Sequence, residues 1–233
     1  GEELLGAMQN RVLNTSVLLS PRSQTRIPVS CTESGRWSSQ TGKFYDSDEI
    51  MPFSVRSGMK SRVFESLRYG RRDANQSQVW HDIDRLSADF RSDSPTSALK
   101  DLTRSQRESL DTSIEDFQIT ENQIGALLFI DGRNVGMELV SDPVVFKSLW
   151  PRLLRSYVLD SRRFRKRTSE RSETPSEHAH EVISEVINAT WDEFPGVGVG
   201  TDLRLNYDGA TGSVLEYEGN IVHMSVMNDR IKV

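Results

Sequence analysis

The clearest hydrophobic pattern in the chain lies at residues 124–140, with the sequence IGALLFIDGRNVGMELV. Two apolar, β-rich runs flank an Asp-Gly turn at 131–132, which predicts a β-hairpin with a short loop. The first arm, ALLFI, is apolar on both faces, as expected of a central strand. Further along, TDLRLNY, GSVLEYEG and IVHMSVM predict three more short strands, separated by turn residues at 208–209 and 218–220.

Two strands are also predicted near the N-terminus. The sequence VLNTSVLL, within residues 4–19, alternates imperfectly between apolar and polar positions. The sequence RIPVSC at 26–31 carries Pro28, which favours a strand start or a sheet edge, and a Ser-Gly turn follows at 34–35. Residues 38–51 are rich in Ser, Gly and Asp and are predicted to form a loop.

Apolar residues at helical spacing predict five helices. In the helix after residue 143, Pro151 predicts either a kink or a fresh helix start. A Ser-Pro-Thr start signal at 94–96 precedes a helix with a thin apolar stripe, which is expected to lie on the surface. The predicted ranges are 52–70, 76–90, 98–117, 144–161 and 177–191.

Strands, then helices, then strands again, without regular alternation, indicate an α+β fold. We expect a mixed or antiparallel sheet with several helices packed against it. Residues 161–176 carry almost no apolar side chain and are predicted to be a polar linker. The linker would join a core at 1–160 to a helix and three-stranded segment at 177–233, packed on the same domain. Because the chain opens on GEELLGAMQN without a starting Met, an N-terminal portion is expected to precede it.

Composition narrows the class of protein. The 233 residues are 36% hydrophobic and 27% charged, which indicates a soluble globular protein. A net charge of −5 argues against a nucleic-acid partner or binding to anionic lipid. A single cysteine excludes an internal disulfide and favours a cytoplasmic location. No apolar run approaches the roughly 20 residues needed to span a bilayer, so no membrane partner is expected.

Cys31 is the candidate nucleophile, and Glu33 is a second catalytic candidate. A catalytic cysteine needs a base or a positive field to lower its pKa, yet no local signature of a cysteine hydrolase surrounds Cys31. The alternative is a small buried residue on a strand. His178 and His180 stand two apart on a predicted helix, so their rings diverge by about 200°. We therefore predict no metal site and no cofactor.

The glycines of GVGVG at 196–200 raise the question of a phosphate-binding loop. A dinucleotide-binding fingerprint places its glycines between a strand and a following helix. Here a predicted helix precedes the glycines and a strand follows, so a flexible exit from the helix is expected instead.

The densest polar cluster lies at the N-terminal end. If the segments around Val12 and Val29 pair in one sheet, the polar groups beside them crowd together at the ends of the sheet. They could bind a polar ligand through amides and a guanidinium, with Trp37 as a stacking wall. Alternatively, these groups satisfy one another and the backbone of the following loop. The ligand-binding candidates are Gln9, Asn10, Arg11, Asn14, Arg36 and Trp37.

Several motifs resemble one bacterial family of unknown function. They are GEELLGAMQNRVLNTSVLL, IPVSCTESGRW, the pair Val79-Trp80, and IGALLFIDGRNVGMELV followed by LWPRLLRSYVLD. The family is the ADP-ribosylglycohydrolase and rhodanese-phosphatase-superfamily-associated protein domain, and the resemblance covers residues 1–160. The resemblance implies a genomic association with enzymes that remove ADP-ribose. ADP-ribose or a related nucleotide is therefore a candidate ligand. It transfers no catalytic residues.

Three functional hypotheses follow. The leading one is a cytoplasmic accessory domain that binds a small polar, nucleotide-derived ligand such as ADP-ribose, or a protein partner. The second is a hydrolase of ADP-ribose- or NAD-linked metabolism that uses Glu33 or Cys31, with Arg36 holding an anion. The third is a purely structural interaction module.

Overall fold

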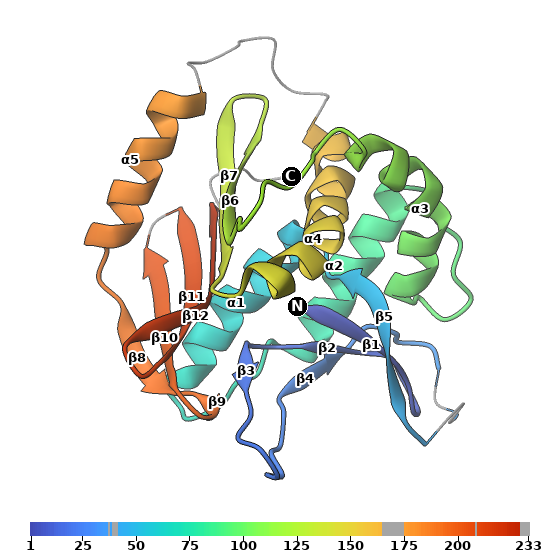
Figure 1. The fold of residues 1–233 in the computed structure, drawn as a ribbon. Coiled ribbons are helices and arrows are strands. Elements are labelled where there is room, and N and C mark those ends of the chain that lie inside the picture. The colour runs from blue at the N-terminus through green and yellow to red at the C-terminus, as the bar shows by residue number, and fades with distance from the viewer. Residues whose placement is uncertain (37, 39–41, 165–174, 208, 229–233) are drawn as a thin grey trace. The chain divides into compact units, whose positions relative to one another are not determined.

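The computed structural model describes all residues except 37, 39–41, 165–174, 208 and 229–233 (Figure 1). Within this part, helices alternate irregularly with mostly antiparallel sheets, and the predicted α+β class is confirmed. The chain folds as two compact units, each assembled from three separate segments. The first unit is Gly1–Thr15, Arg26–Gln118 and Leu149–Asp160, and the second is Ser16–Thr25, Ile119–Ser148 and Ser161–Val233. The domain boundary at 160 and the linker at 161–176 stay predictions.

The first unit contains a four-stranded antiparallel sheet. The predicted pairing of the two N-terminal segments is confirmed, with Leu13 opposite Val29. The predicted loop at 38–51 is wrong for its second half, which forms an edge strand with few apolar residues. Backbone pairing and ion pairs, rather than an apolar run, stabilise this strand. The order is β4-β2-β1-β5, with β1 (Glu2–Gly6), β2 (Arg11–Leu13), β4 (Val29–Cys31) and β5 (Phe44–Ile50).

The helices α1 (Phe53–Leu67) and α2 (Gln76–Asp89) form where the apolar spacing predicts them. The apolar residues of that spacing are buried, among them Val63 and Val79, both fully. Asn75 caps α2, because its side-chain Oδ1 accepts a hydrogen bond from the Gln78 N–H.

The next helix, α3 (Leu99–Ile114), follows the predicted start signal. Ser94 Oγ accepts a hydrogen bond from the Ala98 N–H at 2.8 Å. The thin apolar stripe of α3 is nevertheless fully buried at Leu99, Leu102 and Leu110. The fourth predicted helix, α4 (Pro143–Phe164), continues through Pro151 without restarting.

The second unit is built on a six-stranded antiparallel sheet. The predicted hairpin is confirmed, and its loop residues Asp131 and Gly132 both have positive φ, 50° and 76°, as a type I′ turn requires. Glu218 and Gly219 repeat this geometry; the other predicted turn includes residue 208, which lies outside the described residues. The order is β6-β7-β12-β11-β10-β8, with β6 (Gly125–Ile130), β7 (Arg133–Val140), β8 (Asp192–Pro195), β10 (Thr201–Tyr207), β11 (Ala210–Tyr217) and β12 (Asn220–Asn228).

The prediction that ALLFI forms a central strand is wrong. It is β6, which stands at one edge of the sheet and is mostly half-buried. The core lies instead between the middle strands and helix α5 (Pro175–Asn188), the orange helix of Figure 1. Its buried members are Val186, Leu205, Val214, Met224 and Val226.

The glycines of GVGVG lie beside a short parallel pair of strands, β3 (Val17–Leu18) and β9 (Val197–Gly198). Gly198 has φ +85°, and a Cβ there would stand 2.1 Å from the Leu18 carbonyl oxygen. Close backbone packing, rather than a flexible helix exit, explains this glycine. In the described part of the chain, no helix is both long and apolar enough to cross a membrane.

Candidate functional site

The pairing of β2 with β4 brings several of the predicted site residues together in the first unit. Arg11 stands opposite Cys31 in the register, so their side chains share one face of the sheet. Just beyond the ladder, the Thr32 N–H donates to the Asn10 carbonyl at 3.0 Å. The two polar segments that the sequence places about twenty residues apart are thus neighbours in the fold.

On this face Arg11, Gln9 and Cys31 form one group. Arg11 Nη1 donates to Gln9 Oε1 at 3.2 Å and also contacts Cys31 Sγ. The side-chain amide of Gln76, at the start of α2, binds both backbone groups of Cys31, at 2.7 and 2.9 Å. Burial raises the pKa of the Cys31 thiol, and the charge of Arg11 offsets this only in part. The thiol is therefore protonated at neutral pH.

Arg36 forms a second group, and all five of its N–H donors have protein acceptors. Nε donates to Glu33 Oε2 at 2.8 Å, and Nη2 lies 2.8 Å from the same oxygen. Nη2 also donates to Asn10 Oδ1 at 3.1 Å. Nη1 donates to the carbonyls of Ala7 and Ser38 at 2.9 and 3.2 Å. Arg36 thus ties the β1–β2 turn to the chain after β4.

Glu33 is held from both sides. Thr96 Oγ1 donates to Glu33 Oε1 at 2.7 Å, while Arg36 occupies the other carboxylate oxygen. Burial alone would raise the pKa of Glu33, but the hydrogen bonds from Arg36 and Thr96 outweigh it and lower the pKa. A carboxylate with a lowered pKa and few open acceptor positions is a weak proton acceptor.

Two amide donors near these groups have no hydrogen-bond partner among the described residues. They are Gln9 Nε2 and Asn10 Nδ2, on residues only 4% and 1% exposed. The oxygens of the same amides are satisfied, by Arg11 for Gln9, and by Arg36 and the Gly6 N–H for Asn10. Leaving such a donor unsatisfied costs about 1–3 kcal/mol, so each calls for a partner.

The remaining predicted residues stand apart from these groups. Asn14 Nδ2 donates to the Arg72 carbonyl at 2.9 Å, and Asn14 Oδ1 accepts from Ser30 Oγ at 2.8 Å. Both ends of the Asn14 amide are therefore occupied in the core. Trp37 lies outside the described residues.

Glu3 belongs to the polar N-terminal cluster of the sequence, but its burial was not predicted. It is fully buried in β1, and burial, reinforced by the charges of Glu49 and Glu33, raises its pKa to about 7 against the hydrogen bond from Thr32. The alternation of apolar and polar residues could not predict the burial of Glu3, because β1 has only five residues and the adjacent acid, Glu2, is half-exposed. In the described parts of the chain, no group of three or more His, Cys, Asp or Glu side chains could hold a metal ion.

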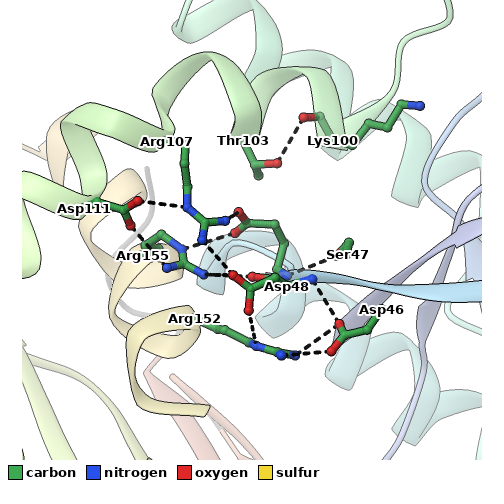
Figure 2. A network of polar contacts seen from close by, with 10 residues as sticks. Asp46, Ser47, Asp48, Lys100, Thr103, Arg107, Asp111, Arg152 and Arg155 are labelled. Carbon is green, nitrogen blue, oxygen red and sulfur yellow. Dashed lines mark hydrogen bonds and ion pairs between the residues drawn. The ribbon is translucent and has the colours of Figure 1, made fainter. Parts of the chain in front are cut away.

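A second feature that the sequence did not reveal is an arginine–aspartate network in the same unit, drawn in Figure 2. It joins strand β5 to α3 and to the part of α4 that belongs to the first unit. Its side chains lie more than a hundred residues apart at the extremes, so no local motif marks it. The members are Asp46, Asp48, Glu49, Arg107, Asp111, Arg152 and Arg155.

The first unit is therefore an α+β domain whose small sheet carries a buried cluster of amides, carboxylates and guanidiniums. The chain belongs to the family of the ARG and Rhodanese-Phosphatase-superfamily-associated Protein domain, whose model matches residues 1–227. The name records association with ARG and rhodanese-phosphatase proteins, in agreement with the accessory role predicted from the sequence. Comparison with curated proteins and comparison with solved structures each gave no match.

Proposed function

We propose that the first unit is an accessory ligand-binding domain that takes a small anionic ligand derived from a nucleotide, such as ADP-ribose. The binding groups would be Arg11 and the side-chain amides of Gln9 and Asn10. The observation that carries the proposal is the pair of buried amide donors without partners, on adjacent residues next to a guanidinium. The association of the family with ARG proteins is the reason for proposing ADP-ribose as the ligand.

Arg11 is the guanidinium with donors to spare. Among the described residues its contacts are with Gln9 and Cys31, both through Nη1, and the side chain is half-buried. Nε and Nη2 can therefore present a bidentate edge to a phosphate, which is the geometry in which arginine binds phosphate best. Amide N–H groups beside it suit hydroxyl or carbonyl oxygens of the same ligand.

In this proposal Glu33 and Arg36 are positioning residues. Because every donor of Arg36 is used within the protein, its contribution is to hold the β1–β2 turn that carries Gln9 and Asn10. Asn14 acts in the same indirect way through Ser30. Cys31 would border the ligand as a neutral thiol, and Trp37 keeps its predicted role as a stacking surface.

The test is titration of the protein with ADP-ribose, with NAD as a comparison, followed by thermal shift and calorimetry. A ligand at a hundred times its Kd stabilises the native state by about 2.7 kcal/mol, which raises Tm measurably. Arg11→Gln should strongly reduce the shift. The matched control is Arg85→Gln, which removes an exposed arginine of α2 and should leave binding unchanged. No shift at millimolar ADP-ribose, or an equal shift in the Arg11 variant, would overturn the proposal.

The hydrolase alternative predicts turnover rather than binding alone. If Cys31 or Glu33 acts in catalysis, Cys31→Ala or Glu33→Gln abolishes release of product from ADP-ribose or NAD under conditions in which circular dichroism shows the variant to be folded. If the domain only binds, neither compound is consumed. The protein-partner and structural alternatives predict no response to either compound.

A further inference from the structure

Strand β5 contains a bulge with an unusual backbone. Along the β1–β5 ladder, Glu2 pairs with Ile50 and Leu4 with Asp46. Between these two pairs β5 therefore contains two more residues than β1. Asp48, inside the bulge, has φ +61°, a conformation that costs roughly 1 kcal/mol or more for a residue with a Cβ. Bulges of this kind aim a side chain away from the regular ladder.

The side chain that the bulge aims is the carboxylate of Asp48, and three guanidiniums converge on it (Figure 2). Arg107 Nη2 lies 2.7 Å from Asp48 Oδ2, and Arg155 Nη2 lies 3.2 Å from the same oxygen. Arg152 Nε lies 2.9 Å from Asp48 Oδ1. Both oxygens of one carboxylate are thus held by three arginines from two helices.

We propose that Arg107, Arg152 and Arg155 form a binding site for a phosphate group, and that the carboxylate of Asp48 occupies this site as an internal stand-in. An incoming phosphate displaces Asp48, which swings toward solvent. This site uses none of the residues assigned to the ligand above, so the two proposals stand or fall separately.

The composition of the site favours phosphate. Arginines bind phosphate through paired N–H groups, and three of them can serve three phosphate oxygens, one more than a carboxylate has. The side chain of Arg155 is only 5% exposed, and its Nε has no hydrogen-bond partner among the described residues; Glu49 Oε2 lies 3.5 Å from it. A third phosphate oxygen would supply the acceptor that Asp48 leaves missing.

The exposure of the side chains allows the exchange. The side chain of Asp48 is 51% exposed and that of Arg107 37%, so a small anion can reach the site and Asp48 can leave it. Asp46, Glu49 and Asp111 stay paired with the arginines when Asp48 leaves, and Glu2 Oε1 lies 3.9 Å from Arg152 Nη1, so the site keeps no excess of positive charge. Specific hydrogen bonds rather than excess charge then hold the phosphate, so we expect affinity in the millimolar range for the native protein.

The test compares native protein with Asp48→Gly by calorimetry, using inorganic phosphate, pyrophosphate and ADP-ribose as separate titrants. If Asp48 fills the site nine-tenths of the time, removing it tightens phosphate binding about tenfold. Glycine also relieves the positive φ, which offsets part of the stability lost with the ion pairs of Asp48, and thermal unfolding checks that the variant is folded. The control Asp84→Gly removes an exposed carboxylate of α2 and should leave binding unchanged. Adding Arg107→Gln to Asp48→Gly should abolish the gain.

A second measurement uses the native protein alone. Saturating pyrophosphate should shift the NMR signals of the Nε–Hε groups of Arg107 and Arg155, while the exposed Arg104 on the same helix as Arg107 stays unchanged. A response to pyrophosphate alone would indicate a free diphosphate, and a stronger response to ADP-ribose a nucleotide source. Equal affinities of native protein and Asp48→Gly, or a gain that survives Arg107→Gln, would overturn the proposal, as would unchanged arginine signals.

Discussion

Thr32 donates its hydroxyl proton to Glu3 Oε1 at 2.6 Å, and both residues are fully buried. The second carboxylate oxygen, Oε2, has no hydrogen-bond partner among the described residues. One hydroxyl cannot compensate a buried negative charge that also faces the charges of Glu49 and Glu33, so burial raises the pKa of Glu3 to about 7. The first unit therefore contains an acid that is partly protonated at neutral pH.

Glu3 should make the protein less stable as the pH rises. The folded-state pKa of about 7 lies above the ordinary value of 4.5, so this acid stabilises the fold fully below pH 4.5 and the contribution is lost through pH 7. The shift corresponds to about 3 kcal/mol. We expect Glu3→Gln to be more stable than the native protein at pH 8 and to lose this dependence. Urea unfolding of both proteins between pH 5 and 8 measures the difference, and parallel curves would contradict it.

Glu33→Gln should destabilise the first unit strongly. The variant leaves the buried guanidinium of Arg36 without its carboxylate, and breaking such a buried pair costs about 3–5 kcal/mol. Glu65→Gln, on the exposed side of α1, is the matched control and should change the free energy of unfolding little. A double-mutant cycle with Arg36→Met measures the coupling between the two residues. Additive effects would show that Glu33 and Arg36 do not act as a unit.

Asn75 has two roles at the start of α2, which substitutions can separate. Its side chain caps the helix, and its backbone has φ +58°. Asn75→Ala loses the cap and keeps a Cβ at positive φ, and should cost about 2 kcal/mol. Asn75→Gly loses the cap and relieves the backbone, and should cost only a few tenths. Thermal unfolding of the two variants measures the difference; equal losses would contradict this division.

Gly198 and Gly219 offer a matched pair of positive-φ glycines in the second unit. Both have φ near +80°, but an added Cβ meets the Leu18 carbonyl oxygen at 2.1 Å at Gly198 and open space at Gly219. Gly219→Ala should cost about 1–2 kcal/mol from the backbone alone. Gly198→Ala should cost about 1–3 kcal/mol more, because β9 must move away from β3. Equal costs in denaturant unfolding would show that the β3–β9 contact yields easily.

The sequence was most informative where structure is local. An Asp-Gly pair between two apolar runs needs only its own φ preferences to form the β6–β7 hairpin, and helical spacing was enough for α1 and α2. It failed for β5, whose alternation carries charged residues instead of apolar ones. It also failed for the position of β6 in its sheet, because an apolar run does not say how many neighbours a strand will have.

The sequence by itself determined the α+β class, most of the helices, the hairpins and the approach of the Gln9–Arg11 segment to Cys31. Only the tertiary structure decided which polar groups are satisfied and which are left over. All N–H donors of Arg36 are bonded to Glu33, Asn10 and two carbonyls, whereas Nε and Nη2 of Arg11 have no partner among the described residues. The three arginines around Asp48 come from α3 and α4 and meet a bulge in β5. Hydrogen bonds and ion pairs depend on distances of a few ångströms between residues far apart in the chain, and no pattern of residue types fixes those distances.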